Sequence, residues 1–125
     1  MLNIKNIKFR GPDKKPVKSE EMYSDYISSP AIGRARLGKA YFYYRDLGKK
    51  YYIPYDYIDQ AFTRISECTE DEFGNSAEYF RLVLMHGGKE FANLIFEKRT
   101  QVEDLKQELV KINPAIELKL PEKKR

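Results

Sequence analysis

The chain has 125 residues, of which 42% are hydrophobic and 14% aromatic, and its 23 basic and 19 acidic side chains give a net charge of +4. This length suits one domain with a proper core, and the apolar content excludes a wholly disordered chain. The single cysteine, Cys68, excludes an internal disulfide, and no apolar run approaches the roughly 20 residues of a membrane-spanning helix. The N-terminus lacks the apolar region of a secretory signal, so we expect a cytoplasmic protein.

The charge is uneven along the chain. Residues 1–18 hold six basic and one acidic side chain, residues 119–125 hold four and one, and residues 19–118 hold thirteen and seventeen. The ends therefore sum to +8 and the body to −4, so the basic balance says little about a nucleic-acid surface on the fold itself. We expect any polyanion to bind the ends, and deletion of residues 1–18 and 121–125 to leave the melting temperature nearly unchanged. A docked strand made of the apolar residues from Leu2 to Phe9 would contradict this expectation.

The first 31 residues are expected to form an arm, a linker and a short helix. The apolar residues up to Phe9 suit an edge strand or an arm, and residues 11–18 have the Pro, Gly and charge content of a linker. Ser19 precedes two glutamates, an N-cap followed by acids in the first turn, which predicts a short helix over residues 19–29.

Strand signals begin at Ile32 and are separated by tight turns. Alternation in residues 32–37 predicts one strand with Arg34 and Arg36 on the same face, and a strand rich in aromatic residues follows at 39–45. Residues 46–49 form a turn in which Gly48 can take a positive φ. A third strand covers 50–53 and ends at Pro54, which marks a sheet edge or a break, and a fourth covers 58–66.

An acidic loop, residues 67–77, leads to a hairpin of residues 78–85 and 89–96 around His86-Gly87-Gly88. Thr100 and Glu103 have the spacing of a capping box, and apolar residues at 102, 105, 109 and 112 form one stripe. These signals predict a helix over about 100–112, ended by Asn113-Pro114, and a basic tail at 117–125. The expected core residues are Leu37, Phe42, Ile53, Ile58, Phe62, Leu82, Leu84, Phe91, Ile95, Leu105 and Leu109.

The stretch GRARLGKAYFYYRDLGKKYYIPYDYI and the pattern from Phe96 to Pro114 resemble bacterial pleckstrin-homology-like (PH-like) domains. The shared features are a Gly-led strand, an aromatic strand, a turn and an Ile-Pro-aromatic-Asp-x-Ile step, here residues 53–58. The resemblance covers about residues 32–116 and implies a mainly β fold, a β-barrel with one C-terminal capping helix. Relatives use this scaffold for lipid headgroups, peptides, protein partners or self-assembly, so the fold alone does not define a function.

Basic residues gather in the first strands of this stretch, with Asp46 as the one acid among them. In phosphoinositide-binding relatives a basic cluster at the first hairpin holds headgroup phosphates, and Arg34-Ala35-Arg36 matches the end of that pattern, although no Lys lies at a suitable distance before it. The alternative is that these arginines flank an exposed strand face and pair with acids elsewhere. The candidate ligand- or partner-binding residues are Arg34, Arg36, Lys39, Arg45, Lys49, Lys50, Tyr55 and Tyr57.

Signals of catalysis or metal binding are weak. His86 is the only histidine, it forms no zinc-type spacing with Cys68, and phosphate-cradling or nucleophile-elbow motifs are missing. The acidic run from Glu67 to Glu72 does not fit a twelve-residue calcium loop. We therefore expect no enzyme activity, no cofactor and no metal.

The leading hypothesis is a non-enzymatic module that binds a protein or peptide, or associates with itself, at an edge marked by Pro54 and exposed tyrosines. The chief rival is binding of an anionic membrane surface through the basic first hairpin. Single-stranded nucleic acid ranks third, because tyrosines between residues 41 and 57 offer stacking surfaces but the RNA-recognition signature is missing.

Leu105→Asp and Leu109→Asp test the C-terminal helix as part of the core. An unpaired charge on a packed helix face costs several kcal/mol, about the whole stability of a small domain. Each variant should therefore be largely unfolded where the wild type is folded, as thermal denaturation followed by circular dichroism will measure. A wild-type melting curve for either variant would contradict the predicted packing.

Overall fold

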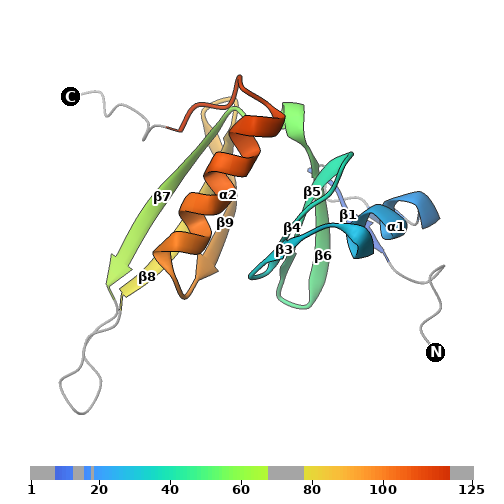
Figure 1. The fold of residues 1–125 in the computed structure, drawn as a ribbon, viewed down its shortest axis with the longest axis horizontal. Helices are drawn as coiled ribbons and strands as arrows, with labels where there is room; N and C mark the ends of the chain where they lie inside the picture. The colour runs from blue at the N-terminus through green and yellow to red at the C-terminus, as the bar shows by residue number, and fades with distance from the viewer. Residues whose placement is uncertain (1–7, 13–15, 18, 68–77, 119–125) are drawn as a thin grey trace, which may run out of the picture. The chain divides into compact units, whose positions relative to one another are not determined.

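The computed structural model describes residues 8–12, 16–17, 19–67 and 78–118. The fold is mainly β with a C-terminal helix, as the sequence predicts, and the described strands form two sheets with no closed barrel among them. The chain divides into two compact units, Met1–Tyr57 and Ile58–Arg125, and each is described by itself (Figure 1).

The first unit contains a six-stranded sheet with the strand order β2-β1-β6-β5-β4-β3 and one helix. Its elements are β1 (Phe9–Arg10), β2 (Pro16–Val17), α1 (Glu20–Ser28), β3 (Ala31–Ile32), β4 (Ala35–Leu37), β5 (Tyr41–Asp46), β6 (Lys49–Pro54) and the 3-10 helix η2 (Tyr55–Tyr57). All strand pairs are antiparallel except β1 with β6, which is parallel. The longest pairing in this sheet joins β5 to β6.

Residues 32–37 do not form the single strand that their alternation predicts. Strands β3 and β4 are joined by the two-residue turn Gly33-Arg34, with Ile32 opposite Ala35. Gly33 has a φ of 58°, and a glycine with positive φ at the first turn position is what such a tight hairpin favours. The prediction of a single strand is wrong because the turn residues Gly33 and Arg34 continue the alternation of residue types. The alternation therefore does not reveal that the strand is interrupted.

Helix α1 begins at the predicted N-cap, where the hydroxyl of Ser19 accepts a hydrogen bond from the backbone N–H of Met22 at 3.2 Å. The buried side chains of the helix, Met22 and Tyr26, form a cluster with Phe9 and Tyr43. The ring centroids of Phe9, Tyr26 and Tyr43 lie 5.5 to 5.6 Å apart in edge-on or tilted contacts, a geometry that aromatic rings prefer. An aromatic cluster therefore joins α1 to one face of the sheet.

The carboxylate of Asp25 makes a second connection between α1 and the sheet. It accepts hydrogen bonds from the backbone N–H groups of Lys39 at 2.8 Å and Ala40 at 3.2 Å, and from the hydroxyl of Tyr43 at 2.8 Å. Burial alone would raise the pKa of Asp25, but these hydrogen bonds more than offset that effect and hold the pKa below its usual value. The ionised carboxylate thus orders the turn between β4 and β5.

The burial of Phe9 contradicts the expectation that residues 1–18 contribute little to stability. Its side chain is fully buried, β1 pairs with β6 at Lys50 and Tyr51, and β2, inside the predicted linker, pairs with β1. Deletion of residues 1–18 removes this buried ring, so it should lower the melting temperature rather than leave it unchanged. The other apolar residues of that segment, Leu2, Ile4 and Ile7, and the C-terminal residues 119–125 lie outside the described residues.

The second unit contains a three-stranded antiparallel sheet with the order β7-β8-β9 and the helix α2. Its elements are β7 (Gln60–Glu67), β8 (Glu78–His86), β9 (Lys89–Phe96) and α2 (Arg99–Ile112). The predicted turn at Gly87-Gly88 is confirmed, with φ values of 58° and 80°, as a two-residue hairpin requires. Most of the predicted acidic loop, residues 68–77 with Cys68, lies outside the described residues.

Helix α2 lies across one face of this sheet (Figure 1) and buries Val102, Leu105 and Leu109 completely, as predicted. Strand β9 has the predicted bounds, but the opposite face points inward. Ala92, Leu94 and Phe96 are buried, whereas Phe91 and Ile95 are only half-buried. The two expected core residues are wrong because both faces of β9 carry large apolar side chains, and period-two alternation does not say which face is inward. The remaining expected core residues are buried.

The start of α2 also differs from the prediction. The N-cap is Lys98, whose backbone N–H donates to the side-chain oxygen of Gln101 at 3.3 Å, so the box predicted at Thr100 and Glu103 is wrong. Glu103 instead accepts hydrogen bonds from Thr63 of β7 and from Lys106, both at 2.9 Å. Burial alone would raise the pKa of Glu103, but these two partners hold it below its usual value. Glu103 therefore ties α2 to the sheet.

Asp25→Ala should destabilise the first unit. The change leaves two backbone N–H groups and the hydroxyl of the buried Tyr43 without their acceptor, which costs about 1–3 kcal/mol for a buried donor. Urea denaturation at neutral pH measures the loss. Asp104→Ala is the matched control, because Asp104 is exposed on α2 and should change stability by less than about 0.5 kcal/mol. Equal stability of the two variants would contradict the structural role of Asp25.

The same carboxylate predicts a pH dependence. Because the folded-state pKa of Asp25 lies below its ordinary value, the stability it contributes is complete above about pH 4 and is lost as the pH falls through the folded-state pKa. The stability gap between the wild type and Asp25→Asn should therefore narrow in acid. Urea denaturation at neutral and at acidic pH measures this gap, and a gap independent of pH would contradict the assignment.

Candidate functional site

The candidate site lies at the turn between β5 and β6. Asp46 and Lys49 form the last pair of the ladder, and the two-residue turn Leu47-Gly48 closes it. Both turn residues have positive φ, 51° for Leu47 and 76° for Gly48. This is the backbone of a tight hairpin turn, which suits the right-handed twist of the flanking strands. The next pair inward is Arg45 opposite Lys50, so the hairpin brings two cations together beside its turn.

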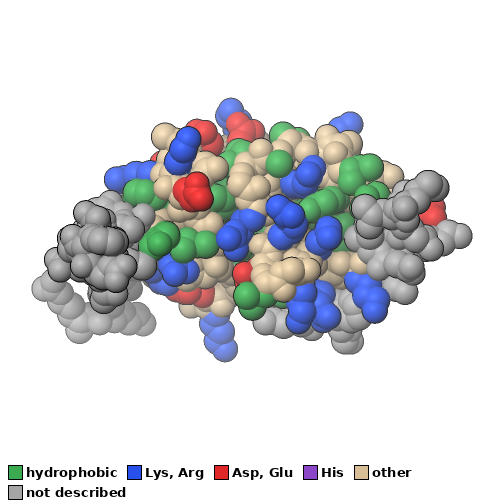
Figure 2. Space-filling view, turned by 90° about the horizontal axis from the view of Figure 1, so that it is seen from below, with side chains coloured by type: hydrophobic (Ala, Val, Ile, Leu, Met, Phe, Trp, Pro, Cys, Tyr) green, Lys and Arg blue, Asp and Glu red, His purple; other side chains and the backbone are tan. Residues whose placement is uncertain are grey.

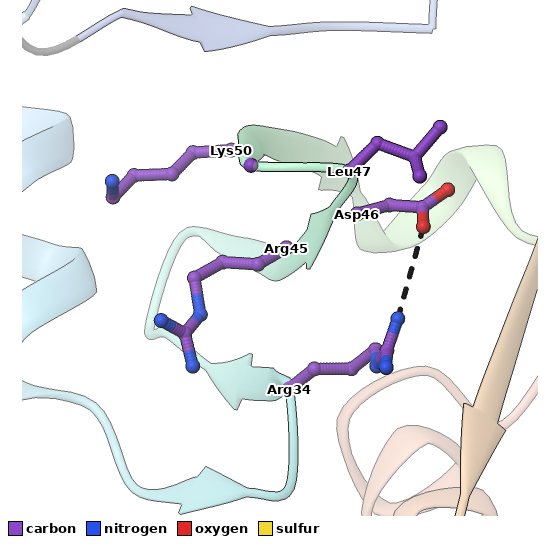
Figure 3. Close-up of a pocket in the computed structure, with 6 residues that line it drawn as sticks. Arg34, Arg45, Asp46, Leu47 and Lys50 are labelled. Carbon is purple, nitrogen blue, oxygen red and sulfur yellow. Dashed lines mark ion pairs between the residues drawn. The ribbon is translucent and has the colours of Figure 1, made fainter.

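A hollow of about 340 Å³ opens beside this turn. This volume lies near the lower end of the range of small-ligand sites, roughly 300–1,000 Å³. We call it the basic hollow. It is lined by Arg34, Arg45, Asp46, Leu47, Gly48 and Lys50. Figure 3 shows Arg45 and Lys50 extending to one side of the hairpin, while Arg34 of the β3–β4 turn reaches the carboxylate of Asp46.

The lining of the basic hollow is electropositive. Three cations, Arg34, Arg45 and Lys50, face one carboxylate, that of Asp46, which leaves a formal charge of +2. The carboxylate is already engaged, since its Oδ1 lies 3.7 Å from the guanidinium of Arg34. Among the described residues no ion pair engages Arg45 or Lys50. Like charges opposite each other on neighbouring strands destabilise a sheet, and an anion bound between them would remove that repulsion.

A further cation lies on the same hairpin as the basic hollow. Figure 2 shows Lys and Arg side chains exposed on the face seen from below. Lys49, another candidate from the sequence, is exposed on the same hairpin next to the turn. Electropositive surfaces of this kind concentrate anions near them, and salt weakens the effect.

The other candidate residues have contacts elsewhere. The guanidinium of Arg36 donates to the backbone carbonyls of Tyr26 at 3.1 Å and Ser29 at 3.3 Å and lies 4.7 Å from the centre of the Tyr26 ring. It therefore supplies the cation that α1 lacks in its last turn. Lys39 is exposed in the turn ordered by Asp25. Neither residue lines the basic hollow.

The two candidate tyrosines lie in η2. Tyr55 is buried and its hydroxyl donates to the carbonyl of Gly38 at 2.6 Å, and burial raises its pKa well above the usual value. Tyr57 is half-buried. All the tyrosines from residue 41 to residue 57 are buried or half-buried, and Tyr44 stacks on Tyr51 with ring centroids 4.9 Å apart. They pack against the protein itself rather than form an open stacking platform.

Local sequence patterns do not single out two residues that matter to this site. Leu47 falls within the turn predicted over residues 46–49, but its positive φ of 51°, which bulky residues rarely adopt, is seen only in the structure. Asp25 orders the β4–β5 turn from 14 or more residues away, and no local pattern marks such a contact.

Elsewhere, the structure describes no group suited to metal binding. Among the described residues no cluster of three or more His, Cys, Asp or Glu side chains is present. His86 ends β8, with its Nδ1 3.7 Å from the carboxylate of Asp59, which also accepts from the backbone N–H of Gly87 at 2.7 Å. No helix within the described ranges is long and apolar enough to cross a membrane.

Comparisons with protein-family models, with curated proteins and with solved structures give no significant match.

Arg36 and Arg45 should respond differently to the same substitution. Arg36→Ala removes two hydrogen bonds to helix carbonyls and a cation–π contact, so we expect it to cost about 1–2 kcal/mol of stability. Arg45→Ala removes an exposed charge that faces Lys50, so stability should stay equal or rise. Thermal denaturation of the two variants compares them directly. A larger loss for Arg45→Ala would contradict the division between structural and ligand-facing arginines.

Proposed function

We propose that this protein is a non-enzymatic binding module that holds a phosphate-bearing anion in the basic hollow at the β5–β6 turn. The observation that carries the proposal is the cross-strand pair Arg45 and Lys50, two cations of the hollow that no ion pair engages among the described residues. A phosphate group accepts charge-assisted hydrogen bonds from both guanidinium and ammonium groups. Arg34, held at Asp46, adds a third cation from a separate turn.

The order of the elements supports a PH-like domain as part of the proposal. Antiparallel strands joined by two-residue turns are followed by one amphipathic C-terminal helix, as the resemblance implies. In the Ile-Pro-aromatic-Asp-x-Ile step, Ile53, Tyr55 and Ile58 are buried, which gives this sequence feature a packing role. The closed PH-like barrel remains part of the proposal.

Binding of a protein or peptide partner stays a prediction. An open edge at Pro54 and exposed tyrosines would support it. However, β1 covers part of that edge through its pairing with Lys50 and Tyr51, and the tyrosines of this region are buried or half-buried. The same burial removes the support for single-stranded nucleic acid, which needs open aromatic faces.

A double charge reversal tests the proposed function. Calorimetric titration with inositol hexakisphosphate, a soluble phosphate-bearing probe, should show binding that weakens as salt is added. The variant Arg45→Glu with Lys50→Glu should lose more than about tenfold in affinity, equivalent to ~1.4 kcal/mol.

The matched control is Lys89→Glu with Lys98→Glu, which changes the net charge equally at two exposed positions of the second unit. This control should keep most of the affinity. If both double variants lose affinity equally, binding follows net charge and not the hollow, and the proposal is contradicted. Lack of binding by the wild type at low salt contradicts it as well.

A further inference from the structure

Strand β7 is an edge strand of the second sheet. It pairs with β8 along its whole length, and the strand order β7-β8-β9 leaves its other side without a neighbouring strand. An edge of this kind presents backbone N–H and C=O groups that can pair with another extended chain. The side chain of Ile65 on this strand is also 47% exposed. In the described part of the chain, one residue outside the named strands pairs with β7, and it is Glu117.

The chain turns back toward this edge after α2. The backbone N–H of Asn113 donates to the carbonyl of Leu109 at 2.8 Å, and the N–H of Ile116 donates to the carbonyl of Asn113 at 3.1 Å. The side-chain oxygen of Asn113 accepts from the N–H of Ala115 at 3.1 Å, and Pro114 cannot continue the helix. This turn takes the chain past the start of β7 (Figure 1) and buries Ile116.

Glu117 contacts the edge through its backbone. Its N–H donates to the carbonyl of Asp59 at 3.0 Å, and its carbonyl accepts from the N–H of Ala61 at 2.9 Å. These two bonds make one step of a parallel ladder. The receiving segment is itself held in place, because the N–H of Asp59 donates to the carbonyl of Met85 at 2.9 Å and its carboxylate accepts from the N–H of Gly87 at 2.7 Å.

Residues 116–118, which we call the C-terminal strap, have the pattern of a half-buried strand. Ile116 is buried, Glu117 is exposed and Leu118 is half-buried. This alternation is that of a strand with one face on a core and one in solvent. Both the backbone bonds and the side-chain pattern of the strap are therefore those of a strand that begins on the edge of β7.

The edge of β7 extends beyond its contact with the strap. Every second residue of a strand turns its backbone N–H and C=O to the same side, so Thr63 and Ile65 face the same way as Ala61. Among the described residues no backbone hydrogen bond reaches Thr63 or Ile65 from this side. The edge can therefore receive more of an extended chain than the one step that Glu117 makes.

We infer that the free edge of β7 is a strand-acceptor site, and that the chain closes this site with its own C-terminal strap. The strap is joined to α2 by a short turn, and a segment tethered in this way acts at an effective concentration of roughly millimolar. A free extended chain at micromolar concentration therefore does not displace it. Release of the strap opens the site. The site lies in the second unit and does not depend on the basic hollow.

Glu117→Pro releases the strap in the intact chain. The substitution removes the N–H that donates to Asp59, and proline is not tolerated at a paired position of a ladder. A fluorescently labelled peptide of residues 113–125 should then bind at the open edge. Fluorescence anisotropy should give a dissociation constant at least tenfold lower for the variant than for the wild type, whose site is occupied.

Two controls separate the backbone contact from other effects. Glu117→Ala keeps both backbone bonds and changes only an exposed side chain, so it should bind the peptide as weakly as the wild type. The same peptide carrying Glu117→Pro should not bind to the opened protein, because it lacks the donor that pairs with Asp59.

Amide hydrogen exchange of the full-length protein reports the strap independently. The N–H of Ala61 donates to Glu117, so its exchange should be slow in the wild type and at least tenfold faster in Glu117→Pro. The amides of β8, the central strand, should keep their protection in the variant, since their partners lie within the sheet.

Each result has one meaning. Peptide binding by Glu117→Pro together with fast exchange at Ala61 supports the strand-acceptor site. Unchanged exchange at Ala61 overturns it, because the strap then does not hold the edge. Fast exchange at Ala61 without peptide binding also overturns it, because the open edge then accepts no strand. Loss of protection throughout β8 in the variant overturns it as well, because residues 116–118 are then part of the core and not a removable strap.

Discussion

The carboxylate of Asp25 is the contact on which the first unit depends. It receives three donors that lie 14 to 18 residues away, two from the β4–β5 turn and one from the ring of Tyr43. The hydroxyl of Tyr43 remains a donor, because burial and its bond to Asp25 raise its pKa far above the usual value. Position 38 requires a glycine, since an added Cβ would collide with the Asp25 carboxylate. Helix, turn and strand are thus fixed by one ionised group.

This attachment reaches the candidate site through strand β5. Tyr43 and Arg45 lie two residues apart on the same face of the strand, so the contact that holds Tyr43 also sets the direction of Arg45. The sheet places Lys50 directly opposite Arg45. The repulsion between these two like charges destabilises the sheet. Among the described residues no ion pair compensates this repulsion. A local rule broken in this way is typical of a site whose partner lies outside the fold.

Features set by local chemistry are predictable from the sequence of this protein. Ser19 as an N-cap, Gly87-Gly88 as a hairpin turn, and the stripe of Val102, Leu105 and Leu109 each depend on neighbours within four residues. The incorrect predictions concern features that residues nearby in the sequence do not determine.

The predicted core includes Phe91 but not Phe96, whereas the structure buries Phe96 and leaves Phe91 half-buried. Strand periodicity alone does not say which face of a strand points inward. The pairing of β1 with β6 and the contacts of Asp25 join segments with no shared pattern. For the site, composition found the basic residues, but only the fold separates Arg45 and Lys50, which line the hollow, from Arg36, which caps a helix.

The parallel pairing of β1 with β6 has a consequence for how the chain is made. Phe9 leaves the ribosome about forty residues before the start of β6, the strand that receives β1. During that interval, the ring that will be wholly buried has no sheet to pack on, whereas each later hairpin can close as soon as its turn is synthesised. The ring of Phe9 therefore stays unshielded by the sheet until β6 emerges, and the core of the first unit closes only after that strand has been made.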